Sequence, residues 1–160
     1  MLSKTQANVL KKITTLLEEN NIAFQVTGGL AAIAYGAKRP LYDIDIDVYK
    51  KDISKVRKLF ANCLKKDFYH LQDEHFDMWL LTIIIDEVNI DISQAEKSYF
   101  INKKGKKIKM DSDISKAKII TIGQTRIPIQ KKKELVAYKK IIGRKTDLLD
   151  IQQITNWESF

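Results

Sequence analysis

The strongest constraint on the fold of this chain is the run from Asp43 to Val48, in which aspartate alternates strictly with aliphatic residues. Successive side chains of a β-strand point to opposite faces, so the run predicts a strand with Asp43, Asp45 and Asp47 on one face and an apolar opposite face. Like charges roughly 6.5–7 Å apart along a strand destabilise one another. A divalent cation removes that cost, and carboxylate oxygens favour Mg²⁺ or Mn²⁺. The strand is therefore predicted to bind metal, with a solvated edge strand as the alternative.

A second run, residues 88–93, shows the same alternation and places Asp91 among the residues of its polar face. It is predicted to form a hairpin with the apolar run 76–85. On a strand next to the first carboxylates, Asp91 supplies a third ligand and completes a site for two metal ions. Asp86, in the turn between the two runs, is a weaker candidate for that position.

A pair of glycines, Gly28 and Gly29, follows the predicted strand 22–27 and precedes a short helix of small residues that stops at Gly36. Glycines at such a turn let a phosphate approach the backbone closely. A nucleoside triphosphate (NTP) would place its phosphates on the glycines and its metal ions on the aspartate strand, an arrangement suited to in-line attack at phosphorus. The glycine pair by itself also fits an ordinary turn.

The remaining hydrophobic pattern predicts an alternation of helices and strands. The predicted helices cover residues 4–19, 30–35, 53–60, 131–142 and 147–154, and the predicted strands cover 22–27, 43–48, 76–85, 88–93, 119–122 and 125–129. Residues 94–116 are predicted as a lysine-rich loop or a ragged hairpin. The expected fold class is α+β (α/β), a mixed β-sheet flanked by helices. One domain is expected over residues 1–160, with its core at about 22–93 and a basic loop and C-terminal helices at 94–160.

Charge and composition narrow the function classes. The net charge is +8, and residues 97–145 hold sixteen lysines and arginines against three acidic residues. Such a segment is either solvated surface or a field that attracts a polyanion such as nucleotide phosphates or RNA. No apolar run reaches the roughly 18–20 residues of a membrane span, and the polar N-terminus lacks the features of a secretory signal, so a cytoplasmic protein is expected. With one cysteine, Cys63, and two histidines, the sequence excludes an intrachain disulfide and a cysteine–histidine zinc site.

The spacing of these motifs resembles a known signature. Gly28 and Gly29, thirteen intervening residues, then Asp43-Ile44-Asp45 and a later strand aspartate resemble the nucleotidyltransferase signature of the DNA polymerase β superfamily, in its minimal (MNT-like), antibiotic-nucleotidyltransferase branch. Residues 28–39, Gly-Gly-Leu-Ala-Ala-Ile-Ala-Tyr-Gly-Ala-Lys-Arg, are similar to the Gly-Gly-Leu-Ala…Gly…Arg run of that branch. Leu41 departs from it, since many members have threonine there.

The signature can be aligned with this sequence in two registers. Sliding it by two residues makes Asp45 and Asp47 the metal pair, as in proteins similar to the aminoglycoside 2″-nucleotidyltransferases. The spacing from Arg39 favours Asp43 and Asp45. In the favoured register the resemblance implies that Asp43 and Asp45 hold both metals and that Asp91 binds the catalytic metal.

The C-terminal segment is also similar to small nucleotidyltransferase-like proteins, through Lys139 and the Arg144-x-x-Asp147-x-x-Asp150 element. The resemblance implies that Lys139 or Lys140 binds a phosphate and that Arg144 partners Asp147 or the nucleotide. A solvated lysine face is the alternative. Arg39 is likewise predicted to bind the nucleotide, or else to form a surface ion pair with the aspartate strand.

The resemblance implies a metal-dependent enzyme that transfers a nucleoside monophosphate from an NTP, with ATP favoured, to an unidentified acceptor. The related enzymes modify antibiotics, RNA or proteins, and the basic segment favours an anionic macromolecule as acceptor. A homo-oligomer is expected if a second subunit completes the acceptor site. The alternative from another class is a non-catalytic binding module of the same fold, either antitoxin-like or RNA-binding.

Overall fold

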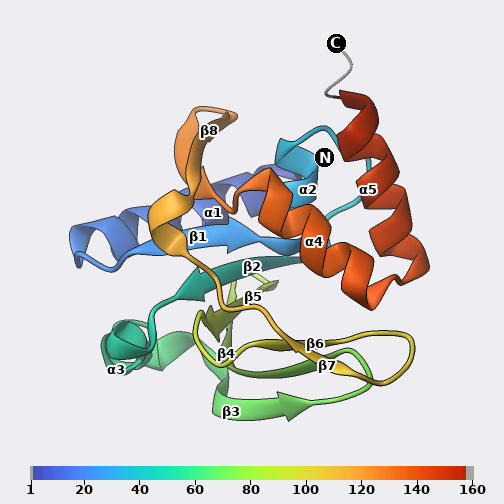
Figure 1. The fold of residues 1–160 in the computed structure, drawn as a ribbon. Helices are drawn as coiled ribbons and strands as arrows, with labels where there is room; N and C mark the ends of the chain where they lie inside the picture. The colour runs from blue at the N-terminus through green and yellow to red at the C-terminus, as the bar shows by residue number, and fades with distance from the viewer. Residues whose placement is uncertain (1, 158–160) are drawn as a thin grey trace.

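The computed structural model describes residues 2–157 as a nine-stranded sheet flanked by helices (Figure 1). Its main elements are α1 (Lys4–Glu19), β1 (Phe24–Thr27), α2 (Gly28–Ala34), β2 (Asp43–Val48), α3 (Ile53–Leu59), β3 (Leu64–Gln72), β4 (Phe76–Ile85), β5 (Val88–Gln94), β6 (Tyr99–Ile101), β7 (Lys107–Lys109), β8 (Lys118–Ile122), β9 (Thr125–Ile129), α4 (Lys132–Ile142) and α5 (Lys145–Trp157). Short 3-10 turns lie at Lys50–Asp52, Ala61–Cys63 and Ile114–Lys116. Within residues 2–157, no helix combines the length and hydrophobicity that a bilayer crossing requires.

The strand order is β7-β6-β4-β5-β2-β1-β9-β8, and β3 pairs with β4 outside this order. The pairs β2–β5 and β1–β9 are parallel, whereas the other pairs are antiparallel. This confirms the predicted mixed sheet with flanking helices. It also puts β2 and β5, the two strands of the predicted metal site, side by side in the middle of the sheet.

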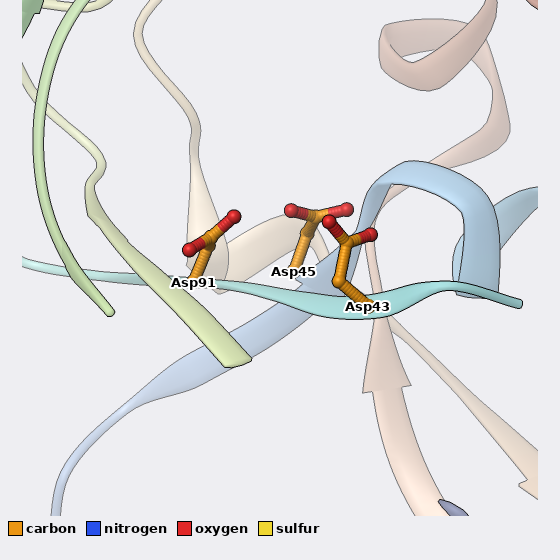
Figure 2. A group of neighbouring side chains, drawn as sticks. All are labelled: Asp43, Asp45 and Asp91. Carbon is orange, nitrogen blue, oxygen red and sulfur yellow. The ribbon is translucent and has the colours of Figure 1, made fainter. Parts of the chain in front are cut away.

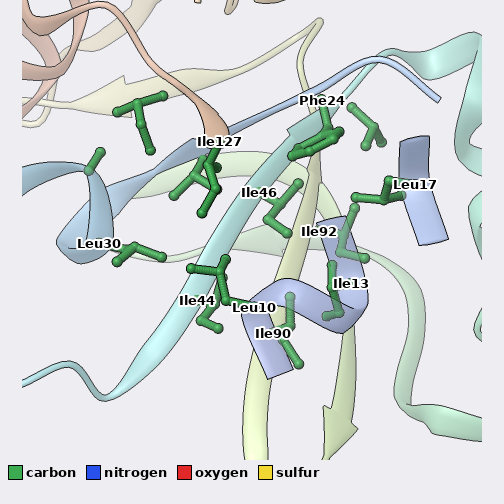
Figure 3. Close-up of a cluster of buried hydrophobic side chains, with 14 of the residues drawn as sticks. Leu10, Ile13, Leu17, Phe24, Leu30, Ile44, Ile46, Ile90, Ile92 and Ile127 are labelled. Atoms are coloured by element: carbon green, nitrogen blue, oxygen red, sulfur yellow. The ribbon is translucent and has the colours of Figure 1, made fainter. Parts of the chain in front are cut away.

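One face of the central strands forms the hydrophobic core. The alternation in β2 and β5 buries their isoleucines on this face, where α1 packs across them (Figure 3). The core side chains of α1 include Leu10, Ile13 and Leu17, each at most 1% exposed. Burying an aliphatic side chain of this size stabilises the fold by about 1.5–3 kcal/mol. The apolar face is thereby covered, and the aspartate face lies on the other side of the sheet.

One segment was not predicted from the sequence, and another takes one of its two predicted forms, the hairpin. Leu64–Gln72, which received no assignment from the sequence, forms β3 along β4. Most of its side chains are exposed or half-buried, so it has no periodic apolar pattern, and its backbone pairing with β4 makes it a strand. The lysine-rich segment contains the short hairpin β6–β7, which pairs with β4 through Phe76 and Phe100.

The last two helices return to the sheet. α4 ends at Gly143, which adopts the left-handed conformation (φ 65°) that glycine tolerates best, and α5 starts two residues later. Helix α4 contacts β6, α2 and α5. Figure 1 shows α4 and α5 together on one side of the molecule, beside α2. The C-terminal segment thus reaches the region of the glycine turn.

Candidate functional site

Three carboxylates from two neighbouring strands converge on the polar face of the sheet. In the parallel register of β2 and β5, Asp45 lies directly opposite Asp91. One carboxylate oxygen each from Asp43, Asp45 and Asp91 lies within 4.8 Å of the other two (Figure 2). Figure 2 shows all three side chains rising from the same face. The structure therefore brings together the trio that the favoured register of the sequence signature predicts.

The surroundings of the trio disfavour the charged forms of Asp45 and Asp91. Burial raises the pKa of Asp45 well above its ordinary value, and the charges of Asp43, Asp91 and Asp47 raise it further, while Lys139 opposes them. Burial also raises the pKa of Asp91, against the effect of a hydrogen bond of 2.6 Å donated by the Thr82 hydroxyl. Three oxygen donors in a partly desolvated position suit a hard divalent cation. The residues present therefore fit Mg²⁺ or Mn²⁺.

Asp47 lies on the same face but is held differently. Its Oδ2 accepts hydrogen bonds from Gln25 Nε2 at 3.0 Å and from Ser112 Oγ at 2.7 Å. Burial raises the pKa of Asp47 to about 6, although these two hydrogen bonds lower it. Asp47 is 8% exposed and is not one of the residues whose oxygens converge. Asp86 is exposed at the β4–β5 turn and is likewise not one of them.

The two glycines adjoin the trio. Gly28 has a φ of 63°, and a Cβ at this position would overlap Oδ2 of Asp45. A Cβ on Gly29 would lie 3.4 Å from Cζ of Arg39. The absence of side chains here lets the turn sit directly against a carboxylate and a guanidinium. The predicted glycine turn and the predicted metal strand are therefore in contact.

A network of five charged side chains lines the other side of the turn. Arg39 Nη1 lies 2.8 Å from Asp150 Oδ2, and Lys139 Nζ lies 3.0 Å from the same oxygen. Lys139 Nζ also lies 3.3 Å from Asp147, whose Oδ2 is 2.7 Å from Arg144 Nε. Burial raises the pKa of Asp147, but Arg144 and Lys139 outweigh it, so the pKa lies below its ordinary value.

This network bears on three residues predicted to bind the nucleotide. Arg39, Lys139 and Arg144 line one cleft together with the trio and the glycines. Each of the three also forms an ion pair with a carboxylate of α5. Arg144 partners Asp147, one of its two predicted partners. Arg39 forms an ion pair with Asp150 of α5. The alternative given for Arg39, an ion pair with the aspartate strand, names a different partner. Lys139 is 2% exposed, whereas Lys140 is exposed.

The trio, the glycines and the charge network open into one cleft of about 290 Å³. Its far wall is apolar and was not identified from the sequence. Six side chains form this apolar wall: Leu71, Phe76, Met78, Leu80, Phe100 and Tyr138. They come from β3, β4, β6 and α4, and the available signal was the presence of aromatic residues inside the lysine-rich segment. These side chains come together through the β6–β7 hairpin, and the sequence predicts that segment only as a loop or a ragged hairpin.

The fold is that of the nucleotidyltransferases. A Thermotoga maritima protein assigned as a nucleotidyltransferase shares it with a TM-score of 0.73 and 22% identity, over 98% of this chain and 96% of that one. ANT(2″)-Ia in complex with adenylyl-2″-tobramycin has a TM-score of 0.67 and 13% identity, over 96% and 89%. The lincosamide adenylyltransferase LnuA, bound to lincomycin, has a TM-score of 0.56 and 19% identity, over 92% and 95%. No curated protein sequence matches the chain.

The sequence assigns the chain to a narrower group of proteins than the fold does. The model of the aminoglycoside-2″-adenylyltransferase family matches residues 9–154, so the chain belongs to that family. This confirms the antibiotic-nucleotidyltransferase resemblance. The family is one of nucleotidyltransferase enzymes, and the acidic trio is compatible with their use of an NTP and a divalent metal.

Proposed function

We propose that this protein transfers a nucleoside monophosphate from ATP, or another NTP, to a hydroxyl group of an acceptor, with Mg²⁺ or Mn²⁺ as cofactor. The convergence of Asp43, Asp45 and Asp91 carries the proposal. Their oxygens form a compact cluster of acceptors without a neighbouring donor strong enough to bring the pKa of Asp45 back to its ordinary value. Phosphoryl transfer requires such a cluster, because the bound cations neutralise phosphate oxygens.

The three carboxylates have distinct places in this proposal. Asp43 and Asp45, on one strand, would hold both ions, and Asp91 would hold the ion nearer the acceptor. The acceptor oxygen forms a bond to the α-phosphorus, the bond to the bridging oxygen breaks, and pyrophosphate leaves. Asp91, oriented by Thr82, receives the hydroxyl proton, directly or through water. Asp47, engaged by Gln25 and Ser112, is proposed to support the site from beside the trio.

The glycine turn and the basic side chains complete the nucleotide site. Gly28 and Gly29 would let the phosphates lie against the backbone, next to Asp45 and Arg39. Arg39, Lys139 and Arg144 put positive charge on the cleft wall where the departing pyrophosphate gains negative charge. A charge-assisted hydrogen bond of this kind contributes roughly 1.5–3 kcal/mol.

The test is ligand binding with and without metal. A ligand at one hundred times its dissociation constant stabilises a protein by about 2.7 kcal/mol. We expect ATP with Mg²⁺ to raise the melting temperature, ATP with EDTA to raise it much less, and Asp45→Asn to abolish the difference. Asp86→Asn, an exposed carboxylate outside the trio, is the matched control and should behave as the parent. A shift that is independent of metal and of Asp45 would favour the non-catalytic binding module.

Radiolabelled ATP then identifies the transfer. Incubating the protein with α-labelled ATP and cell extract shows whether label appears on small molecules, RNA or protein. The exposed lysines of the β6–β7 turn are the feature that favours RNA, and a homo-oligomer stays a prediction. Release of pyrophosphate without a labelled acceptor would show that the enzyme transfers the nucleotide only to water under these conditions.

A further inference from the structure

Two hydroxyl groups lie beside the glycine turn, and the proposed function gives neither of them a role. Thr27, the last residue of β1, comes directly before Gly28, and its side chain hydrogen-bonds the hydroxyl of Tyr138 on α4. Helix α4 is in contact with α2, which begins at this turn (Figure 1). Thr27 and Tyr138 both line the cleft. The ring of Tyr138 therefore belongs to the apolar wall, whereas its hydroxyl lies at the glycine turn.

The Tyr138 hydroxyl is also close to the carboxylate trio. Burial raises the pKa of Tyr138, and the negative charge of Asp45 raises it further. The hydroxyl therefore keeps its proton at neutral pH. It places a hydrogen-bond donor next to the carboxylates that would hold the metal ions, where the phosphates of a bound nucleotide would lie.

The hydroxyl of Thr27 is turned away from its own helix. Thr27 occupies the position before the first residue of α2, where a threonine side chain commonly accepts a hydrogen bond from a backbone N–H of the first turn. It makes no such bond here. The hydroxyl of Thr27 instead reaches Tyr138, so the pair forms in place of a helix cap and connects α4 to the glycine turn.

The pair leaves one hydroxyl proton free. A hydrogen bond donated to the oxygen of a tyrosine lowers its pKa, and the bond with Thr27 acts on Tyr138 in this direction, so Thr27 is the donor. A hydroxyl that accepts in this way still has its own proton to donate. Within residues 2–157, Thr27 is the hydrogen-bond partner of the Tyr138 hydroxyl. The proton of Tyr138 is therefore available to an oxygen in the cleft.

Packing holds the ring of Tyr138 independently of its hydroxyl. Tyr138 is 6% exposed, and its ring stacks on that of Phe100 with centroids 4.9 Å apart and planes 17° apart. Lys139 Nζ lies 5.5 Å from the centroid of the same ring. A change that removes the hydroxyl and keeps the ring should therefore preserve the shape of the cleft.

We propose that the Tyr138 hydroxyl donates a hydrogen bond to a β- or γ-phosphate oxygen of the bound NTP, which makes Tyr138 a further catalytic residue. The proposal rests on the proposed function, which places the phosphates on Gly28 and Gly29. Negative charge grows on the same oxygens as pyrophosphate leaves, so this hydrogen bond strengthens during the reaction. Thr27 orients the hydroxyl and, by donating to its oxygen, makes it a stronger donor.

Calorimetry with two ligands tests this contact: a non-hydrolysable ATP analogue and inorganic pyrophosphate, each with Mg²⁺. Tyr138→Phe removes the hydroxyl and keeps the ring, so both ligands should bind about tenfold or more weakly. Thr27→Val keeps the side-chain volume and removes the orienting hydroxyl, so it should weaken both ligands to a smaller extent. Tyr35→Phe is the matched control, because Tyr35 is 2% exposed and its hydroxyl donates a hydrogen bond of 2.8 Å to the Gln130 carbonyl. This control should leave both affinities within about twofold of the parent.

The outcomes separate the contact from the function on which it rests. Parent-like binding of both ligands to Tyr138→Phe would overturn the inference. Weaker binding of the ATP analogue alone would place the hydroxyl at the nucleoside and contradict the inference as well. Urea unfolding shows whether Tyr138→Phe is folded; if it is not, parent-like binding by Thr27→Val decides against the contact. If the parent protein binds neither ligand in a metal-dependent way, the proposed function fails, and the inference fails with it.

Discussion

Two sets of buried or half-buried carboxylates, one lining the cleft and one behind its cationic side chains, have opposite electrostatic surroundings. Asp147 and Asp150 of α5 are 1% and 3% exposed, and each contacts two cationic side chains. In the trio on β2 and β5 the carboxylates lie close to one another, and the pKa of Asp45 is raised, first by burial and then by the charges of Asp43, Asp91 and Asp47. The pKa of Asp147, in contrast, is lowered, because its cations outweigh its burial.

The difference in surroundings assigns the two sets of carboxylates to different roles, one in folding and one in function. A buried carboxylate with protein partners is part of the folded framework, since removing a partner leaves an uncompensated charge. A carboxylate group without such partners costs stability until a ligand neutralises it. The paired set should therefore control folding, and the unpaired set should control metal-dependent chemistry.

The largest expected effect comes from the unpaired set. Asp45→Asn removes a carboxylate that the proposed function places on both metal ions, so turnover should fall at least a thousandfold, about 4 kcal/mol in the activation barrier. The metal-free protein should be as stable as the parent or more stable, because a repelling charge has gone. Steady-state transfer and urea unfolding in EDTA measure the two effects. If activity survives both Asp45→Asn and Asp43→Asn, the unpaired carboxylates do not control the chemistry, which would contradict the comparison.

The paired set should respond in the opposite sense. Lys139→Met leaves Asp147 and Asp150 with one cation each and should destabilise the protein by about 3 kcal/mol. Lys140→Met, on the exposed side of the same helix, should change stability by less than about 0.5 kcal/mol. Urea unfolding of both variants gives the comparison. Equal stabilities would show that the five-residue network does not hold α5 in place.

The pH dependence of stability sharpens the comparison at Asp47. Its pKa is about 6 in the folded protein and 3.8 as the ordinary value, so the folded state binds this proton more tightly than the unfolded state. In EDTA the free energy of unfolding should therefore rise by roughly 1 kcal/mol as the pH falls from about 7 to 5. Asp77, whose pKa of about 2 is lowered chiefly by Lys107, acts only at lower pH. Asp45, Asp91 and Glu134, whose pKa values are also raised, act in the same direction, so Asp47→Asn should reduce the rise without abolishing it. An unchanged profile would assign the whole rise to those other groups.

The smallest effect is expected from the exposed lysines of the β6–β7 turn. Replacing Lys103, Lys104 and Lys106 by alanine should leave both stability and metal-dependent ATP binding within about 0.5 kcal/mol of the parent. Lys107 is kept because it pairs with Asp77. Retention on transfer RNA at two salt concentrations completes the measurement, since phosphate contacts weaken as salt rises. Unchanged retention at low salt would remove the reason to consider an RNA acceptor.

The sequence predicts the trio well because alternation in a strand specifies which side chains share a face. A shift of one residue in β2 would bury its aspartates, so the pattern allows one orientation. The same rule identifies Asp91 on β5, and the parallel register then sets it beside Asp45. The helices at α1 and α4 follow equally from their apolar spacing.

The other features of the fold and the site depend on contacts between residues far apart in the sequence, which no local sequence pattern specifies. β3 is a strand because β4 lies next to it, and its own residues are too polar to show a period. The sequence does not distinguish Lys139 from Lys140, and Lys139 is the buried one because two aspartates eight and eleven residues later fold back onto it. Phe100 and Tyr138 meet through the packing of a three-residue strand on a helix, across thirty-seven intervening residues.

The pairing of β1 with β9 has a consequence for the newly synthesised protein. A ribosome releases the trio, on β2 and β5, well before β9 and α5 have left the exit tunnel. Until then β1 has β2 but not β9 beside it, and Lys139, Arg144 and the aspartates of α5 are not yet in place. The nascent chain therefore contains the clustered carboxylates of β2 and β5 before it contains the cationic side chains and aspartates of α4 and α5 that lie near them.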